Sequence, residues 1–265
     1  IVALFAALLA IGVPIIFVLG ISGAVYVYLA NLPLVLVPQR LFVGLNSFLV
    51  LSVPLFILAG NIMNASGITQ RIVNFSDLLV GRVRGGLAYV TLVALMFFSG
   101  ITGAGAADTS AIGSIMIPAM RNQGYKPEYA AAITAAGATV GPIIPPSIAF
   151  VIYGAMADVS IAGLFLAGVI PGILLTLAMS LVVWRQARTH NFPVREVHSS
   201  PRALLRGFVE AFPGLMMPAI ILGGILGGIF TPTEAAAAAV LYALVVGFLV
   251  YRELRPAALW TILRD

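Results

Sequence analysis

Two short stretches of the chain hold the residues whose types and spacing suit ligand binding. Residues 99–108 read Ser-Gly-Ile-Thr-Gly-Ala-Gly-Ala-Ala-Asp, and residues 141–147 read Gly-Pro-Ile-Ile-Pro-Pro-Ser. Hydroxyl oxygens and freed carbonyl oxygens are hard ligands that suit an ion such as Na⁺. Helix N-termini that restart after a break direct their amide dipoles at the same region, which favours an anion. The two stretches together predict a site for a carboxylate and a sodium ion.

The backbone of both stretches is expected to leave regular helix. The three prolines within 142–146 lack amide donors and free the carbonyls one turn earlier. The three glycines within 100–105 disfavour a continuous helix. Irregular backbone survives in a membrane only against protein or a wet cavity, so we interpret 141–147 as an unwound functional segment. The isolated prolines are interpreted as kinks: Pro14, Pro54, Pro171 and Pro218.

Three polar side chains have more than one interpretation. Asp108 either caps the helix that follows it or lines the site, and both roles are compatible. Asn61 either reaches the central site or makes a polar contact between helices. Glu234 follows Thr231-Pro-Thr, which is typical of a helix start, so first-turn electrostatics is expected for it ahead of substrate contact.

The composition narrows the class of protein. Apolar residues make up 61% of the chain and charged residues only 9%, against about 25% charged in an ordinary soluble domain. This excludes a soluble globular domain, and it excludes disorder because disorder needs low hydrophobicity. Cysteine is absent, and no HExxH, GxSxG or P-loop pattern occurs, so no enzymatic activity is predicted. In such a chain a net charge of +5 reports orientation in the membrane.

The lengths of the apolar stretches predict the membrane topology. A hydrocarbon core of ~30 Å needs about 20 helical residues, which fits stretches 41–63, 160–184, 212–230 and 232–251. Stretches 1–30, 86–120 and 129–157 are too long and contain Gly, Pro or polar residues near their middles.

Stretch 86–120 would measure about 52 Å as one helix, so we predict a re-entrant hairpin with helices near 87–100 and 109–120 and a tip near 100–108. This folding places every basic residue except Arg40 in the cytoplasm. The alternative is two ordinary crossings, 86–106 and 109–120, of which the second is too short to span.

These assignments divide the chain into parts. We expect N-terminal scaffold helices (1–64), an amphipathic cytoplasmic connector (65–85) or a plain loop in its place, half of a transport core (86–158, with a broken helix at 129–157), a membrane helix (159–184), a cytoplasmic basic loop (185–211) and the truncated start of a second repeat (212–265). The repeat is suggested because Gly-Val-Pro at 12–14 and Gly-Ile-Phe-Thr-Pro at 228–232 each precede a helix with tyrosine, in opposite orientations. The chain is expected to be a piece of a longer protein.

Four ordered motifs are similar to those of one transporter family. They are Ala-Asp-Thr-Ser-Ala-Ile-Gly-Ser-Ile-Met-Ile-Pro-Ala-Met at 107–120, the proline motif at 141–147, Pro-Leu-Phe-Ile-Leu-Ala-Gly-Asn-Ile-Met at 54–63 and Gly-Ile-Phe-Thr-Pro-Thr-Glu-Ala at 228–235. The chain resembles the large, DctM-like permease subunit of the tripartite ATP-independent periplasmic (TRAP) transporters. The resemblance covers essentially all 265 residues but about two-thirds of such a subunit.

The resemblance implies an all-α polytopic membrane protein, an inverted-repeat elevator-type transporter with a re-entrant hairpin and broken helices, as in the ion-transporter superfamily. It implies Na⁺-coupled import of carboxylates, such as C4-dicarboxylates or sialic acid, across a bacterial or archaeal inner membrane. A periplasmic binding protein would deliver the substrate, a small four-helix membrane subunit would brace the scaffold, and Na⁺ would be the coupling ion with no other cofactor. The alternatives are a related Na⁺- or H⁺-coupled permease that needs no binding protein, an intramembrane enzyme and a structural membrane subunit.

The expected binding residues combine both stretches with one helix: Ser99, Thr102, Gly103, Asp108, Thr109, Gly141, Ile144, Pro145, Pro146, Ser147 and Asn61. Sodium ligands are expected among Ser99, Thr102, Gly141, Ile144 and Pro146. One departure from the family concerns the tip, which is commonly Ser-Gly-Ser-Ser before Ala-Asp and here is Thr-Gly-Ala-Gly at 102–105. Two hydroxyls are therefore lost, and the sodium site must depend on Ser99, Thr102 and backbone carbonyls.

Overall fold

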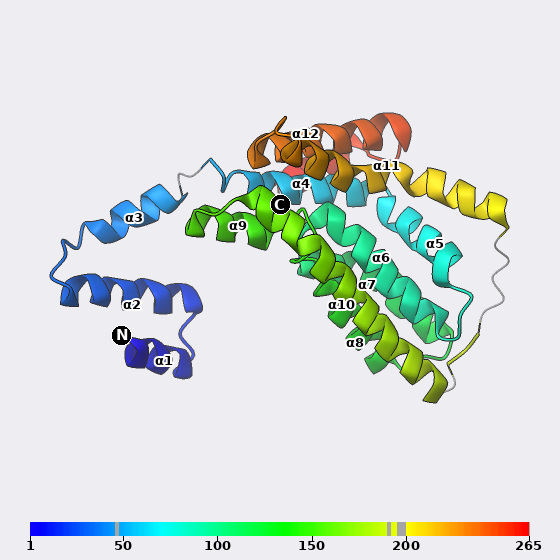
Figure 1. The fold of residues 1–265 in the computed structure, drawn as a ribbon, viewed down its shortest axis with the longest axis horizontal. Coiled ribbons are helices and arrows are strands. Elements are labelled where there is room, and N and C mark those ends of the chain that lie inside the picture. The colour runs from blue at the N-terminus through cyan, green and yellow to red at the C-terminus, as the bar shows by residue number, and fades with distance from the viewer. Residues whose placement is uncertain (46–47, 190–191, 195–199, 265) are drawn as a thin grey trace. The chain divides into compact units, whose positions relative to one another are not determined.

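The computed structural model describes residues 1–45, 48–189, 192–194 and 200–264, which form helices and connecting turns without a strand (Figure 1). The chain divides into two compact units, Ile1–Ser47 and Phe48–Asp265. An all-helical chain is what the lengths of the apolar stretches and the family resemblance predicted.

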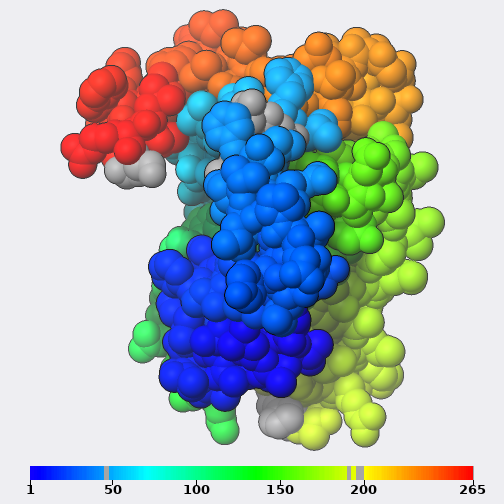
Figure 2. Space-filling model, turned by 90° about the vertical axis from the view of Figure 1, so that its left-hand side faces the viewer, coloured from blue at the N-terminus to red at the C-terminus, as the bar shows by residue number. Residues whose placement is uncertain are grey.

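The first unit contains three helices: α1 (Val2–Ala10), α2 (Ile15–Leu29) and α3 (Leu36–Leu45). The long apolar stretch at 1–30 is divided between α1 and α2, because Gly12 has a φ of +84° and Pro14 forms the N-cap of α2. This unit, blue in Figure 2, exposes large apolar side chains, with Ile16 77% and Phe17 61% exposed. Such a surface suits lipid or another protein rather than water.

The second unit contains the remaining helices, which Figure 1 labels in chain order: α4 (Ser52–Ala65), α5 (Ile68–Val80), α6 (Gly86–Thr102), α7 (Gly105–Asn122), α8 (Pro127–Ala138), α9 (Ile148–Ala157), α10 (Ile161–Thr189), α11 (Pro201–Leu226), α12 (Pro232–Val245), the π-helical turn η1 (Val246–Val250) and α13 (Pro256–Arg264). Helices α6, α7, α8 and α10 pack side by side. Helix α6 is buried along most of its length, with Leu95 and Phe98 at most 1% exposed. It forms the centre of this bundle.

Three helical segments in the described part of the chain are long and apolar enough to cross a membrane: α10, α11 and Pro232–Val250. They overlap the predicted crossings 160–184, 212–230 and 232–251. Both ends of the predicted basic loop 185–211 are helical, because α10 continues to Thr189 and α11 begins at Pro201. Residues 190–191 and 195–199 of that loop lie outside the described residues.

The stretch 41–63, which was predicted to form one crossing, is not a single helix. Helix α3 ends at Leu45 and α4 begins at Ser52, whose hydroxyl donates to the carbonyl of Leu49 at 2.6 Å. Pro54 lies in the first turn of α4, where a missing amide donor costs no helical hydrogen bond. This proline therefore belongs to a helix start and does not kink a crossing.

Helices α4 and α5 meet at a sharp bend of 71°. Gly67 forms the N-cap of α5 with a φ of +74°. Arg71 donates to the carbonyl of Gly67 at 3.0 Å and pairs with Glu253 at 2.6 Å, while its guanidinium lies 3.9 Å from the ring centre of Tyr251. The segment that was predicted to be an amphipathic connector thus contains the helix α5, and the first turn of this helix is tied to the segment after η1.

Candidate functional site

The first candidate stretch forms the end of a helical hairpin. Helix α6 ends at Thr102, and Gly103 follows in the left-handed region with a φ of +62°, its N–H donating to the carbonyl of Ser99 at 3.0 Å. Helix α7 begins at Gly105 after the extended residue Ala104. The non-helical tip therefore comprises two residues, and the predicted tip near 100–108 was too long.

Two of the three glycines in this stretch are helical, and their role is close packing. A Cβ on Gly100 would lie 2.8 Å from a ring carbon of Pro218 on α11. A Cβ on Gly105 would lie 2.6 Å from the carbonyl oxygen of Ala138 at the end of α8. Only Gly103 uses the conformational freedom that the sequence analysis attributed to all three.

Asp108 connects the two arms of the hairpin. Its side chain is fully buried and accepts hydrogen bonds from the hydroxyls of Ser99, at 3.0 Å, and of Thr102. The N-cap of α7 is Ala104, so Asp108 lies inside the first turn and does not cap the helix. The Ser99 hydroxyl also lies 2.6 Å from the carbonyl of Leu95, and its single hydrogen serves one of these two acceptors at a time.

The second candidate stretch separates two short helices. Helix α8 ends at Ala138, α9 begins at Ile148, and residues 139–147 between them are not helical. Ser147 is the N-cap of α9: its hydroxyl accepts from the N–H of Phe150 at 3.2 Å and donates to the carbonyl of Pro142 at 2.6 Å. The same hydroxyl thus joins the two ends of the break and caps the helix that follows.

The hairpin tip packs directly against this break, and we call the contact between residues 103–108 and 138–148 the tip–break seam. A Cβ on Gly103 would lie 2.0 Å from the carbonyl oxygen of Pro146, and the N–H of Ile148 donates to the carbonyl of Gly103 at 3.4 Å. A Cβ on Gly141 would lie 2.4 Å from a carboxylate oxygen of Asp108. The seam is therefore lined mainly by backbone on both sides.

The structure brings most of the predicted binding residues to this seam or beside it: Ser99, Thr102, Gly103, Asp108, Gly141, Pro145, Pro146 and Ser147. The remaining predicted residues point elsewhere. Thr109 donates back to the carbonyl of Gly105 at 2.8 Å, and the side chain of Ile144 packs against Gly172 of α10. Asn61 lies on α4 with an exposed side chain.

Two contacts from outside the hairpin were not predicted from the sequence. A Cβ on Gly60 of α4 would lie 3.2 Å from the backbone of Thr102. Pro218 of α11 lies against Gly100. Only Gly60 had a signal in the sequence, namely a small residue in an apolar helix, which favours close helix packing.

The seam offers both kinds of ligand group that the sequence predicts. The carbonyls of Pro145 and Pro146 face the α6 end of the hairpin, and neither accepts a hydrogen bond from any residue that the structure describes. The N-termini of α7 and α9 both lie beside the seam. Unpaired carbonyls and the Asp108 carboxylate suit a cation, and two helix N-termini suit an anion.

Glu234 has a structural role away from the seam. It completes a capping box at the start of α12, in which the N–H of Thr231 donates to its carboxylate at 2.8 Å and its own N–H donates to the Thr231 hydroxyl at 3.3 Å. The expected first-turn role of Glu234 is confirmed.

Comparison with known proteins identifies the family. A family model described as "Tripartite ATP-independent periplasmic transporter, DctM component" matches residues 2–265. The 2,3-diketo-L-gulonate TRAP transporter large permease protein YiaN of Escherichia coli is 40% identical over 96% of this chain and 60% of its own length. The sialic acid TRAP transporter permease protein SiaT of Haemophilus influenzae is 41% identical over 92% of this chain and 40% of its own.

A third relative has a different substrate in its name. The C4-dicarboxylate TRAP transporter large permease protein DctM of Vibrio cholerae is 40% identical over 94% of this chain and 55% of its own length. The chain thus spans about 60% or less of the length of these relatives. With a family match along almost its whole length, the chain belongs to the DctM family of TRAP transporter large permease components.

Proposed function

We propose that the chain forms part of a Na⁺-coupled permease that imports carboxylates and that the tip–break seam is its contribution to the substrate and sodium site. The observation that supports this most directly is the meeting of hairpin tip and broken helix around the buried Asp108. Two helix N-termini and two carbonyls without donors at one place provide oxygen ligands for Na⁺ and dipoles for a carboxylate. Relatives named for sialic acid, C4-dicarboxylates and 2,3-diketo-L-gulonate support carboxylates as the substrate class.

The hairpin is proposed to be re-entrant. Its arms have 17 and 18 residues, or about 26 and 27 Å of helix, which is shorter than a hydrocarbon core of ~30 Å. Arg84, just before α6, lines a cavity with Arg188 at the end of α10. Lys126, just after α7, lines another cavity with Phe192, just beyond that same end. Both ends of the hairpin thus lie beside one end of α10, as a chain that enters and leaves on the same side requires.

The elevator mechanism and the partners are also proposed. The amphipathic helix α5, bent by 71° from α4, is suited to carry a moving core past a fixed scaffold. A periplasmic binding protein is proposed to deliver the substrate and a small membrane subunit to brace the scaffold, as the family name "tripartite" supports. The second candidate is a permease that works without a binding protein. No feature of the seam supports this candidate over the first.

Uptake by proteoliposomes that contain the full-length permease tests the site. Succinate and sialic acid are supplied with and without a sodium gradient and with and without the binding protein. Asp108→Asn, and Pro145→Ala combined with Pro146→Ala, are expected to abolish sodium-dependent uptake. Glu128→Gln removes an exposed acid in the first turn of α8 and serves as the control, with uptake unchanged. Wild-type uptake with unchanged sodium dependence in Asp108→Asn would contradict the site, and uptake without any binding protein would favour the second candidate.

A further inference from the structure

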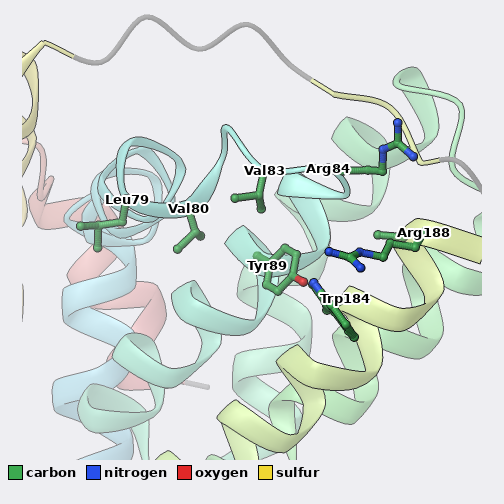
Figure 3. Close-up of a pocket in the computed structure, with 8 residues that line it drawn as sticks. Leu79, Val80, Val83, Arg84, Tyr89, Trp184 and Arg188 are labelled. Atoms are coloured by element: carbon green, nitrogen blue, oxygen red, sulfur yellow. The ribbon is translucent and has the colours of Figure 1, made fainter.

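A cavity of about 580 Å³ lies between the end of α5, the start of α6 and the last turns of α10, away from the tip–break seam (Figure 3). One wall is apolar and consists of Leu79, Val80 and Val83. The opposite wall consists of aromatic and basic side chains from α6 and α10. The cavity is therefore amphipathic, with its charged part at one end.

The charge in this cavity is positive. The guanidinium of Arg188 lies 4.1 Å from the ring centre of Trp184 and extends toward Tyr89, and Arg84 belongs to the same rim (Figure 3). Stacking on an aromatic face leaves the N–H donors of a guanidinium directed outward in their own plane, where they can bind a phosphate. Among the described residues that line the cavity, none is acidic.

The length of α10 predicts that the cavity lies at the level of lipid headgroups. Helix α10 has 29 residues, or about 43 Å, which exceeds the hydrocarbon thickness of ~30 Å. Trp184 and Arg188 lie in its last turns, where the apolar part of the helix ends. Tryptophan and tyrosine prefer the membrane–water interface, and basic residues accumulate at its cytoplasmic side.

We propose that this cavity binds an anionic phospholipid of the cytoplasmic leaflet. Arg188 binds the headgroup phosphate, Trp184 and Tyr89 lie at the level of the glycerol, and an acyl chain follows Leu79, Val80 and Val83. Basic pockets between membrane helices on the cytoplasmic side are the places where such headgroups bind. The bound lipid would contact α5 and α10 together and so bridge the connector and the core bundle.

Native mass spectrometry of the full-length permease, titrated with phosphatidylglycerol or phosphatidylcholine, tests the proposal. The wild type is expected to retain phosphatidylglycerol in preference to phosphatidylcholine. Arg188→Gln is expected to weaken phosphatidylglycerol binding by at least about tenfold, because it removes direct hydrogen bonds to a charged phosphate. Arg185→Gln removes the same charge from the same end of α10 without touching the cavity, so binding should weaken by no more than about fivefold, the effect of one basic residue near an anionic surface.

Three results would overturn the proposal. Equal weakening by Arg185→Gln and Arg188→Gln would show general attraction to the membrane surface and no site. Equal retention of the two lipids would remove the role of the headgroup charge. Displacement of the lipid by inorganic phosphate alone would show a free anion site. Because Arg188 is exposed at a helix end, its replacement is not expected to disturb folding, and circular dichroism of each variant checks this.

Discussion

Replacement of Gly103 by alanine tests whether the tip–break seam is as close as the structure describes. The new Cβ would meet the carbonyl oxygen of Pro146 at 2.0 Å and the Cα of Ser147 at 3.2 Å, and both are backbone atoms that cannot rotate away. The φ of +62° adds the strain of a left-handed residue with a side chain. We expect about 1–2 kcal/mol for the backbone strain and about 1–3 kcal/mol for the overpacking.

Gly124 provides a matched control in the same bundle. Its φ is +84°, and a Cβ there would meet no atom within 4 Å. Gly124→Ala should therefore cost only the backbone strain, about 1–2 kcal/mol, against about 2–5 kcal/mol for Gly103→Ala. The difference between the two variants isolates the contact of Gly103 with Pro146 and Ser147.

Unfolding of both variants in mixed micelles by sodium dodecyl sulfate, followed by far-ultraviolet circular dichroism, measures these free energies. Sodium-dependent uptake should fall in Gly103→Ala and persist in Gly124→Ala, because only the former opens the seam. Equal destabilisation of the two variants would refute the close approach of the tip to the break. Loss of stability without loss of uptake in Gly103→Ala would show that the seam is structural only.

Two further predictions concern the ends of helices. Thr231→Ala removes the hydroxyl of the α12 capping box and should lower the free energy of unfolding by about 1 kcal/mol. Thr231→Ser keeps the hydroxyl and should keep the stability of the wild type. No difference between these variants in the same unfolding assay would show that the cap contributes nothing. The hydrogen bond from Arg71 lowers the pKa of Glu253 below its ordinary value of 4.5. A depressed acid pKa contributes stability that is present above pH 4.5 and is lost as the pH falls through the folded-state pKa. Because both partners are partly exposed, the loss in free energy of unfolding should stay below about 1 kcal/mol. Glu253→Gln should abolish this pH dependence. Identical pH profiles for wild type and variant between about pH 7 and pH 3 would contradict the ion pair.

The cluster of prolines at 142–146 was a more reliable guide to the backbone than the glycines. Three prolines within five residues remove donors wherever they stand, so the break before Ser147 could be located from the sequence. A glycine permits a break but also permits close packing, and the sequence cannot say which use applies. At Gly100 and Gly105 the use is packing, against Pro218 and Ala138, which are distant in sequence.

Helix starts show the same dependence on context. Thr231-Pro-Thr-Glu could be identified as a cap because all its partners lie within four residues. The start of α4 at Ser52 was missed, since Pro54 suits both a first turn and a kink inside a longer helix. The contact of Gly60 with Thr102 joins α4 to the hairpin, and no local pattern predicts it.

A seam lined by main chain has a consequence for how permeases of this kind diverge. The carbonyls of Gly103 and Pro146 and the amide of Ile148 keep their positions whatever side chains evolve on the outward faces of α7 and α9. Residues at the rim can then change while the backbone of the seam is inherited unaltered. The glycines of the seam are the exception, because there a single methyl group alters the geometry of both partners.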